Sequence, residues 1–333
     1  WIDGLNRMDL NIVPAEFVKK TIKSSKFDKH DENTKQKIGS LQSEKPLEVL
    51  FEGVDLNIYK KTNQFSKELV EQMETIEEDF CFLHVGHWLQ GKLGEDRKDL
   101  GMLVKVFCET FKNQKNSPAL VLKTSGATPC IIDREDILDK IENIKKQVVG
   151  NLPNIYVLHG DLRDEEINEL YNHPKIKAHV SFTHGEGFGR PLLEATISEK
   201  PVIASNWSGQ TDFLTNDSIL LPGTLINVAK DSLPKEFLLD ESQWFQVNYQ
   251  YASNVLKEIY KNYPKYVTKS KKQAIVNKTK FSLEKMTEKL DEILTKYLPK
   301  FEEQPQKVDL KLPKLKKVQK PKKVELPKLK KVN

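Results

Sequence analysis

Residues 181–195 read SFTHGEGFGRPLLEA, and this stretch decides the fold. The apolar run at 176–182 leads into it and predicts a buried parallel strand. Gly185, Gly187 and Gly189 then predict a tight turn, and Pro191 near the first helical position indicates that a helix begins there. A strand, a glycine-rich turn and a helix start are typical of the edge where α/β proteins bind phosphate or ribose.

Two carboxylates bracket this turn, Glu186 in the loop and Glu194 in the first turn of the helix. Glu194 is placed to accept two hydrogen bonds from vicinal ribose hydroxyls, while the N–H groups of the helix start favour a diphosphate. Glu186 could bind sugar hydroxyls or lie near charge that develops in a transition state. The alternative is a structural turn with two solvated glutamates. Arg190 occupies the third glycine position of the Gly-x-Gly-x-x-Gly fingerprint, which argues against NAD.

The segment EGFGRPLLEA, with Glu186 and Glu194 in E-x7-E spacing, resembles the donor-site signature of retaining GT-B glycosyltransferases. The branch it resembles most is the glycosyl transferases group 1 (GT4-like) family. The resemblance covers residues 79–298 well and 1–60 partly. It implies a nucleotide-sugar donor on a C-terminal Rossmann-like domain, bound by Gly187, Phe188 and Gly189. It also implies that Glu186 orients the donor sugar as a catalytic residue, that Glu194 holds the ribose, and that no metal or other cofactor is needed.

Cations of the donor site are expected at two further places. Members of the family commonly have Gly-Arg after the first strand of the donor domain and a Lys at the start of the next helix, both contacting the donor diphosphate. This sequence has Gly86 and His87 at the first place and Lys98 at the second. Because His is not reliably charged at neutral pH, Arg97 or Lys92 could compensate. The alternative for Lys98 is a solvated lysine at a helix start.

Other loops at the same edge carry weaker signals. The resemblance matches Leu162, after Gly160-Asp161, to the loop that packs against the nucleotide base. The second glycine-containing loop, at 207–212, offers Ser208 and Gly209 as contacts, while Asp212 is expected to cap the next helix. We expect His184 to hydrogen-bond the loop rather than perform acid–base chemistry.

Strands alternate with helices along the chain, which predicts a parallel, doubly wound α/β sheet. Residues 25–45 are polar and predict an exposed loop. Residues 242–298 predict amphipathic helices broken near Pro264. Strands are expected at 9–14, 47–51, 80–86, 119–123, 154–159 and 201–205, and helices at 15–24, 97–112, 137–149 and 163–172.

Four regions follow from this pattern and from the resemblance. Residues 1–75 are expected to be a remnant of an N-terminal acceptor domain with the interdomain linker, in which GVD at 53–55 lies near the cleft or forms an ordinary turn. Residues 76–240 are the expected Rossmann-like donor domain of a GT-B fold. C-terminal helices follow at 241–300, and a Lys/Pro-rich tail at 301–333.

The positive charge of the chain is concentrated in the tail. Residues 302–333 hold eleven lysines and four acidic residues, whereas the whole chain carries only +5. The tail repeats LPKLKKV, and its prolines and few aromatics predict disorder. Its expected ligands are an anionic surface, nucleic acid or a partner protein; the alternative is a solvated tail without a partner.

The cysteines and the hydropathy pattern bear on location. Cys81, Cys108 and Cys130 lack metal-binding spacing and are odd in number. Cys81 lies in an apolar strand and Cys108 in a helix, which indicates that these two are buried thiols in a reducing compartment. No signal peptide or apolar run long enough to cross a bilayer is visible. We therefore expect a cytoplasmic protein.

Together these features predict a retaining glycosyltransferase that moves a hexose from a nucleoside diphosphate sugar to a hydroxyl of a glycan, protein or lipid. Lys98 would stabilise the leaving diphosphate as a catalytic residue. Because few residues precede the linker, the alternative is a non-catalytic or half-enzyme nucleotide-sugar-binding domain that acts in an assembly. A nucleotide-sugar epimerase on the same fold is a third possibility.

Overall fold

The computed structural model describes residues 1–31, 33–89, 91–126, 128–230, 232, 239 and 241–299. The chain divides into two units, Trp1–Tyr297 and Leu298–Asn333. The predicted basic tail at 301–333 lies outside the described residues, and the first unit contains the candidate site. No helix within the described ranges has the length and apolar character needed to cross a membrane.

The centre of the first unit is a six-stranded sheet in the order β10-β9-β8-β5-β6-β7. Every neighbouring pair in it is parallel, which confirms the predicted sheet. The chain runs outward from β5 through β6 to β7 and then returns to β8 on the other side of β5. Ligands of doubly wound sheets bind at such a reversal, outside the carboxyl ends of the strands. The strands are β5 (Cys81–Val85), β6 (Ala119–Lys123), β7 (Ile155–Leu158), β8 (Ile176–Ser181), β9 (Val202–Ser205) and β10 (Ile219–Leu221).

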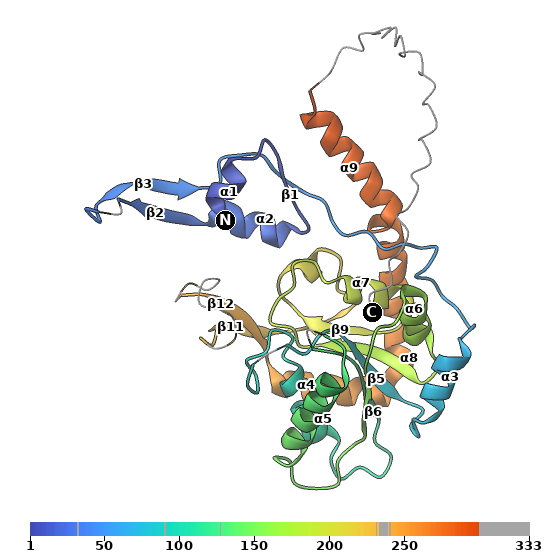
Figure 1. The fold of residues 1–333 in the computed structure, drawn as a ribbon. Coiled ribbons are helices and arrows are strands. Elements are labelled where there is room, and N and C mark those ends of the chain that lie inside the picture. Colours follow the sequence, from blue (N-terminus) through green and yellow to red (C-terminus); the bar gives the residue numbers. More distant parts are fainter. Residues whose placement is uncertain are drawn as a thin grey trace, which may run out of the picture. The chain divides into compact units, whose positions relative to one another are not determined.

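Helices cover both faces of this sheet, because successive side chains of a buried strand point to opposite faces. Phe82 of β5 belongs to one apolar core and Leu83 to the other. The first core lies under α4 and α5, and the second under α3, α6 and α7. In Figure 1, α4 and α5 lie on one side of the sheet and α6 and α7 on the other. These helices are α3 (Lys67–Glu74), α4 (Leu100–Phe111), α5 (Ile131–Lys145), α6 (Asp164–Asn172) and α7 (Arg190–Ile197).

The C-terminal segment differs from the prediction at its start. Residues expected to begin a helix at 242 form β12 (Gln243–Val247), which pairs antiparallel with β11 (Gly223–Asn227). Only then does α8 (Tyr249–Lys280) begin, followed by α9 (Leu283–Tyr297). The break predicted near Pro264 is present, since Asn262 has non-helical angles (φ −123°, ψ 34°). Proline lacks an N–H and crowds the preceding turn, which accounts for the kink.

The N-terminal region contains a hairpin where the sequence predicted a polar loop at 25–45. Strands β2 (Lys26–His30) and β3 (Lys37–Gln42) pair antiparallel, although β2 is fully exposed. The Oδ1 of Asp31 accepts backbone N–H groups of Asn33 and Thr34, so a local turn closes the hairpin without an apolar face. The other elements here are α1 (Ile2–Asn6), β1 (Asn11–Val13), α2 (Glu16–Ser24) and β4 (Leu47–Val49), of which β1 and β4 pair in parallel.

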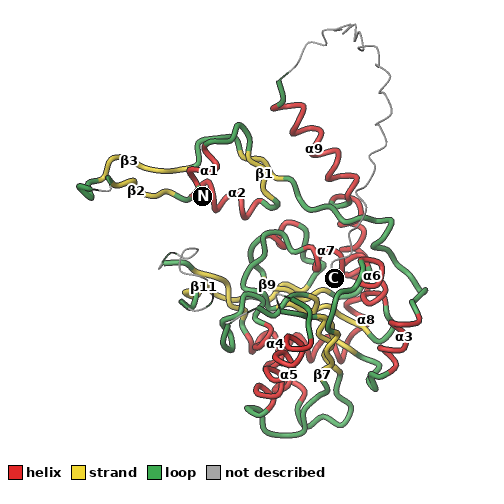
Figure 2. Tube along the Cα trace, viewed as in Figure 1, coloured by secondary structure: helices red, strands yellow, loops and turns green. Residues whose placement is uncertain are grey.

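The linker between β4 and α3 runs as a long loop, drawn green in Figure 2. Its Val54 exchanges backbone hydrogen bonds with the junction of α8 and α9, donating to Phe281 and accepting from Leu283. A Cβ on Gly53 would lie 2.6 Å from the Ser282 carbonyl oxygen, so only glycine fits there. The GVD segment therefore anchors the linker on the C-terminal helices.

Candidate functional site

The glycine-rich loop joins β8 to α7 at the reversal of the sheet. Gly189 is the N-cap of α7 with φ 102°, a conformation that favours glycine, and Pro191 follows in the first turn. Because α7 begins at Arg190, Glu194 lies in the second turn of this helix. The sequence had predicted the first turn. The Phe188 ring is buried against Phe213, so only the backbone of Phe188 is available to a ligand.

Hydrogen bonds join the glycine-rich loop to the neighbouring loop, residues 207–212. The Glu186 N–H donates to Ser208 Oγ at 2.8 Å, and the Gly209 N–H donates to the Glu186 carbonyl oxygen at 3.0 Å. A Cβ on Gly209 would lie 2.2 Å from the Gly187 carbonyl oxygen. Asp212 does not cap a following helix; its Oδ2 accepts the Glu16 N–H at the start of α2, 2.8 Å away.

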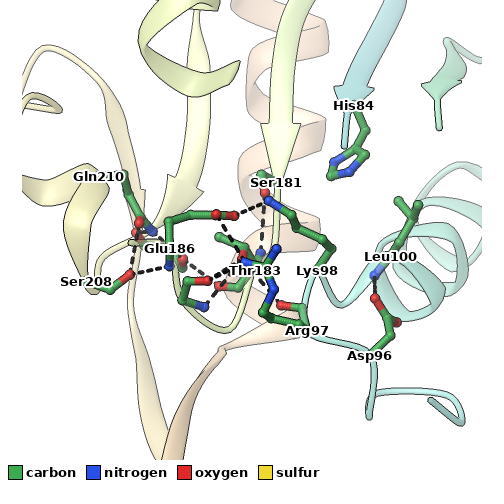
Figure 3. A network of polar contacts seen from close by, with 12 residues as sticks. His84, Asp96, Arg97, Lys98, Leu100, Ser181, Thr183, Glu186, Ser208 and Gln210 are labelled. Atoms are coloured by element: carbon green, nitrogen blue, oxygen red, sulfur yellow. Dashed lines mark hydrogen bonds and ion pairs between the residues drawn. The ribbon is translucent and has the colours of Figure 1, made fainter. Parts of the chain in front are cut away.

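Glu186 is the centre of a compact charge cluster. Lys98 Nζ lies 2.5 Å from Glu186 Oε1, and Arg97 Nη1 lies 3.2 Å from Oε2. Arg97 Nη1 also donates to the Gly185 carbonyl oxygen at 3.1 Å. Figure 3 shows both cations reaching Glu186 from the turn before α4, with Ser208 and Gln210 on the other side of the loop. The structure thus brings together Lys98, Arg97 and Glu186 from segments almost 90 residues apart.

Burial and charge oppose each other in this cluster. The side chains of Lys98 and Glu186 are each 10% exposed. Burial would raise the pKa of Glu186, but Lys98 and Arg97 outweigh it and lower that pKa, so the carboxylate stays ionised. Burial lowers the pKa of Lys98, and Glu186 opposes that shift. The cluster is a preorganised set of one carboxylate and two cations at the carboxyl end of the sheet.

Glu194 occupies a separate environment one turn into α7. It is 7% exposed, and its Oε1 accepts from Arg190 Nη2 at 3.2 Å and from Nε at 3.3 Å. Burial raises its pKa, and Arg190, whose side chain is 55% exposed, only partly opposes this. A buried carboxylate with a half-exposed partner can exchange that partner for ligand hydroxyls.

Gly86 and His87 follow β5 at the same edge. The Gly86 N–H donates to the Lys123 carbonyl oxygen at 3.1 Å, and a Cβ on Gly86 would lie 3.6 Å from Lys98 Cε. His87 is exposed, and its Nδ1 lies 3.3 Å from Ser125 Oγ. The cation beside Lys98 in the cluster is therefore Arg97, one of the two residues expected to compensate for His87.

A comparison with protein families bears on the class of this domain. Residues 98–236 match the family described as "Glycosyl transferases group 1". The match includes the Lys98 turn, the glycine-rich loop and both glutamates. This central part of the chain is therefore similar to a group 1 glycosyltransferase domain.

Solved structures share the fold of this domain and its flanking segments. Anabaena HepE in complex with UDP and glucose has a TM-score of 0.60 at 15% identity, over 89% of this chain and 65% of that one. Sucrose-phosphate synthase from Thermosynechococcus elongatus has a TM-score of 0.59 at 15% identity, over 89% and 60%. A glycosyltransferase from Rickettsia africae has a TM-score of 0.57 at 18% identity, over 90% and 67%.

These likenesses show the GT-B fold. The chain spans 65% of HepE and 60% of the synthase. A search of curated protein sequences found no match.

In the part of the chain that the structure describes, two cavities open at the carboxyl edge of the central sheet. One, of about 310 Å³, is lined by Leu162 together with Lys123, His159 and side chains of α3. Lys123 Nζ donates to the Gly160 carbonyl oxygen at 2.7 Å, which fixes the loop before Leu162. The structure thus places Leu162 at a cavity large enough for a planar base.

The second cavity, of about 320 Å³, is lined by Glu186 and Arg97. Phe17 of α2, Trp207 and Trp244 of β12 supply its apolar wall. Of these, Trp244 was missed by the sequence analysis, which had placed its segment in a helix. The hairpin of β11 and β12 reaches the loop through tertiary contacts, for which the local sequence holds no signal.

Among the described residues, no cluster of three or more His, Cys, Asp or Glu side chains has a geometry that could hold a metal ion. The roles of the site residues stay predictions. The structure does bring Lys98, Arg97 and Glu186 into contact, with Gly86 beside Lys98. It pairs Glu194 with Arg190. It places Leu162 at a neighbouring cavity.

Proposed function

We propose that this domain binds a nucleoside diphosphate sugar and transfers its hexose to a hydroxyl acceptor with retention of configuration. The contact that carries the proposal is the cluster of Lys98, Arg97 and Glu186 behind the glycine-rich loop. The family match and the GT-B fold support glycosyl transfer. UDP and glucose in the HepE complex, and UDP and GlcNAc in the pneumococcal O-GlcNAc transferase GtfA, support a nucleotide-sugar donor.

The proposed chemistry breaks the bond between the anomeric carbon and the diphosphate. The nucleoside diphosphate leaves with the electron pair, and Lys98 and Arg97 stabilise the charge that develops on it. The acceptor oxygen bonds to the anomeric carbon from the same face, and its proton passes to the departing phosphate oxygen. Because the cluster supplies positive charge from side chains, the proposal includes no resident metal or other cofactor.

Glu186 is proposed to orient the donor sugar. Both of its carboxylate oxygens accept hydrogen bonds from cations, so it is held as a hydrogen-bond acceptor and not as a free nucleophile. A glycosidase-type pair of acid and nucleophile is accordingly not part of the proposal. Glu194 is proposed to release Arg190 and accept the ribose hydroxyls, with the base in the cavity at Leu162.

The alternative is a donor-binding half without catalysis. Glycan, protein and lipid hydroxyls all remain candidate acceptors. We also propose docking of the basic tail on an anionic surface or partner protein. The free, buried thiols of Cys81 and Cys108 support a reducing compartment, for which we propose the cytoplasm.

Donor turnover separates these functions. The chain is incubated with UDP-glucose, UDP-GlcNAc and GDP-mannose, with and without sugar acceptors, and released nucleotide and sugar products are identified by NMR. A transferase releases nucleoside diphosphate and forms a product with the donor's anomeric configuration, and Glu186→Gln abolishes both. An epimerised sugar would assign the epimerase instead, and bound but unconverted donor would assign the binding half.

A further inference from the structure

The turn that carries Lys98 also contains Asp99, whose side chain does not cap the helix that follows. Asp99 is the N-cap of α4, a position where Asp normally accepts an N–H of the first turn. Here Asp96 does so, since its Oδ1 accepts the Leu100 N–H at 3.2 Å. Asp99 instead adopts φ 51°, which is strained for a residue with a Cβ. Its carboxyl group is thereby turned into the protein.

The Asp99 carboxyl group is fully buried. Tyr249 of α8 donates its hydroxyl to Asp99 Oδ2 at 2.7 Å. The other oxygen, Oδ1, has no hydrogen-bond partner in the described part of the chain. It faces the His184 ring, whose Nε2 lies 3.9 Å away. Burying a carboxylate oxygen without a donor is costly, so a positive charge nearby is the expected compensation.

His184 faces hydrogen-bond acceptors on both sides of its ring. Nδ1 lies 2.7 Å from the Phe245 carbonyl oxygen, and Nε2 lies 3.2 Å from the Gly94 carbonyl oxygen. A neutral imidazole has one N–H and can donate to only one of them, whereas an imidazolium donates to both. The ring also stacks on Trp244, with centroids 4.1 Å apart and planes at 15°, a surface that favours a cation.

We propose that His184 carries a proton and forms a buried imidazolium–carboxylate pair with Asp99, which positions Glu186 against Lys98. His184 lies two residues before Glu186, and Asp99 directly follows Lys98. A backbone hydrogen bond also joins the two segments, because the His184 N–H donates to the Arg97 carbonyl oxygen at 3.0 Å. Both are positioning residues, since they act through their neighbours.

Burial opposes a charge on either group, while the carbonyl oxygens of Phe245 and Gly94 and the charge of Asp96 oppose the fall in the pKa of His184. Burial raises the pKa of Asp99 to about 8, and burial lowers the pKa of His184. Each isolated charge is therefore unfavourable. A proton on Asp99 Oδ1 would have no acceptor in hydrogen-bond range, whereas a proton on His184 Nε2 has the Gly94 carbonyl oxygen. The two carbonyl oxygens around the His184 ring therefore favour the proton on the imidazole over Asp99 Oδ1.

The wild-type protein tests the protonation state directly. Ring nitrogens of 15N-labelled histidine show by NMR whether they carry hydrogen. His84 is a buried internal control: its Nδ1 donates to the Val180 carbonyl oxygen at 3.0 Å, and its Nε2 is unpartnered among the described residues. At pH 7 we expect two protonated ring nitrogens in His184 and one in His84. A single protonated nitrogen in His184 would overturn the proposal.

Substitutions test the positioning role, which rests on the proposed function. Asp99→Asn keeps the shape and the contact with Tyr249, and we expect it to remove one ring proton from His184. We expect Asp99→Asn and His184→Gln each to weaken UDP binding about ten-fold, the effect of one lost charged hydrogen bond. The double variant should be no weaker than either, because the two act as one unit.

The exposed His30→Gln serves as the control and should bind UDP like the wild type. Additive losses in the double variant, or unchanged UDP binding in Asp99→Asn, would overturn the positioning role. If wild-type protein binds no nucleotide at all, the donor-site proposal fails, while the NMR result still decides the pair.

Discussion

Replacing Lys98 by methionine removes the closest partner of a buried carboxylate, and its cost follows from the geometry. Lys98 Nζ lies 2.5 Å from Glu186 Oε1, and both side chains are 10% exposed. Removing one member of a buried ion pair costs about 3–5 kcal/mol. Arg97 remains 3.2 Å from Glu186, but its side chain is 41% exposed and returns only part of that free energy. We therefore expect the free energy of unfolding to fall by about 2–3 kcal/mol.

Urea unfolding followed by tryptophan fluorescence measures this loss. The double variant Lys98→Met with Glu186→Gln removes the uncompensated charge, so it should recover about 1–2 kcal/mol relative to Lys98→Met. Lys112→Met is the matched control, because its pair with Glu109 is 2.6 Å long but exposed, and it should cost less than about 1 kcal/mol. Equal stabilities of Lys98→Met and Lys112→Met, or a double variant less stable than Lys98→Met, would refute the reasoning.

Two further substitutions test the loop. Burial raises the pKa of Glu194 above its ordinary value of 4.5. The ionised form therefore destabilises the fold at neutral pH, and this effect is absent below the ordinary pKa, where the carboxyl group is protonated in both the folded and the unfolded state. Glu194→Gln should therefore unfold at a higher temperature than wild type at pH 7, with the difference vanishing below about pH 4; identical melting curves at pH 7 would contradict this. Gly209→Ala places a Cβ 2.2 Å from the Gly187 carbonyl oxygen and should lower the melting temperature and weaken UDP binding, whereas Gly39→Ala, with nothing within 4 Å, should do neither. Near-wild-type UDP binding by Gly209→Ala would show that the close approach of the two loops does not matter for the site.

Elements with a strong local pattern could be predicted from the sequence. The central strands from β5 to β9 are short apolar runs between turn residues, and the glycine-rich loop lies where Gly185, Gly187 and Pro191 placed it. The short edge strand β10 was missed.

The tertiary contacts of the site could not be derived from spacing. Lys98 and Glu186 meet only because β5 and β8 are neighbours at the reversal of the sheet. The resemblance to a known family assigned both residues to one donor site but did not predict their contact. Asp99 follows the pattern of an ordinary N-cap, yet Asp96 takes that role. Strand β12 was predicted to be helical, because its pairing partner β11 lies outside any local window.

Calorimetric titration with UDP, GDP and ADP tests the donor site most directly. Wild type, Glu194→Gln and Glu199→Gln are compared, the last as a control whose side chain pairs with Lys278 at 3.5 Å. We expect one nucleotide to bind at a single site, Glu194→Gln to weaken it about 10- to 100-fold through lost charged hydrogen bonds, and Glu199→Gln to match wild type. Failure of all three nucleotides to bind, or wild-type affinity in Glu194→Gln, would contradict the account.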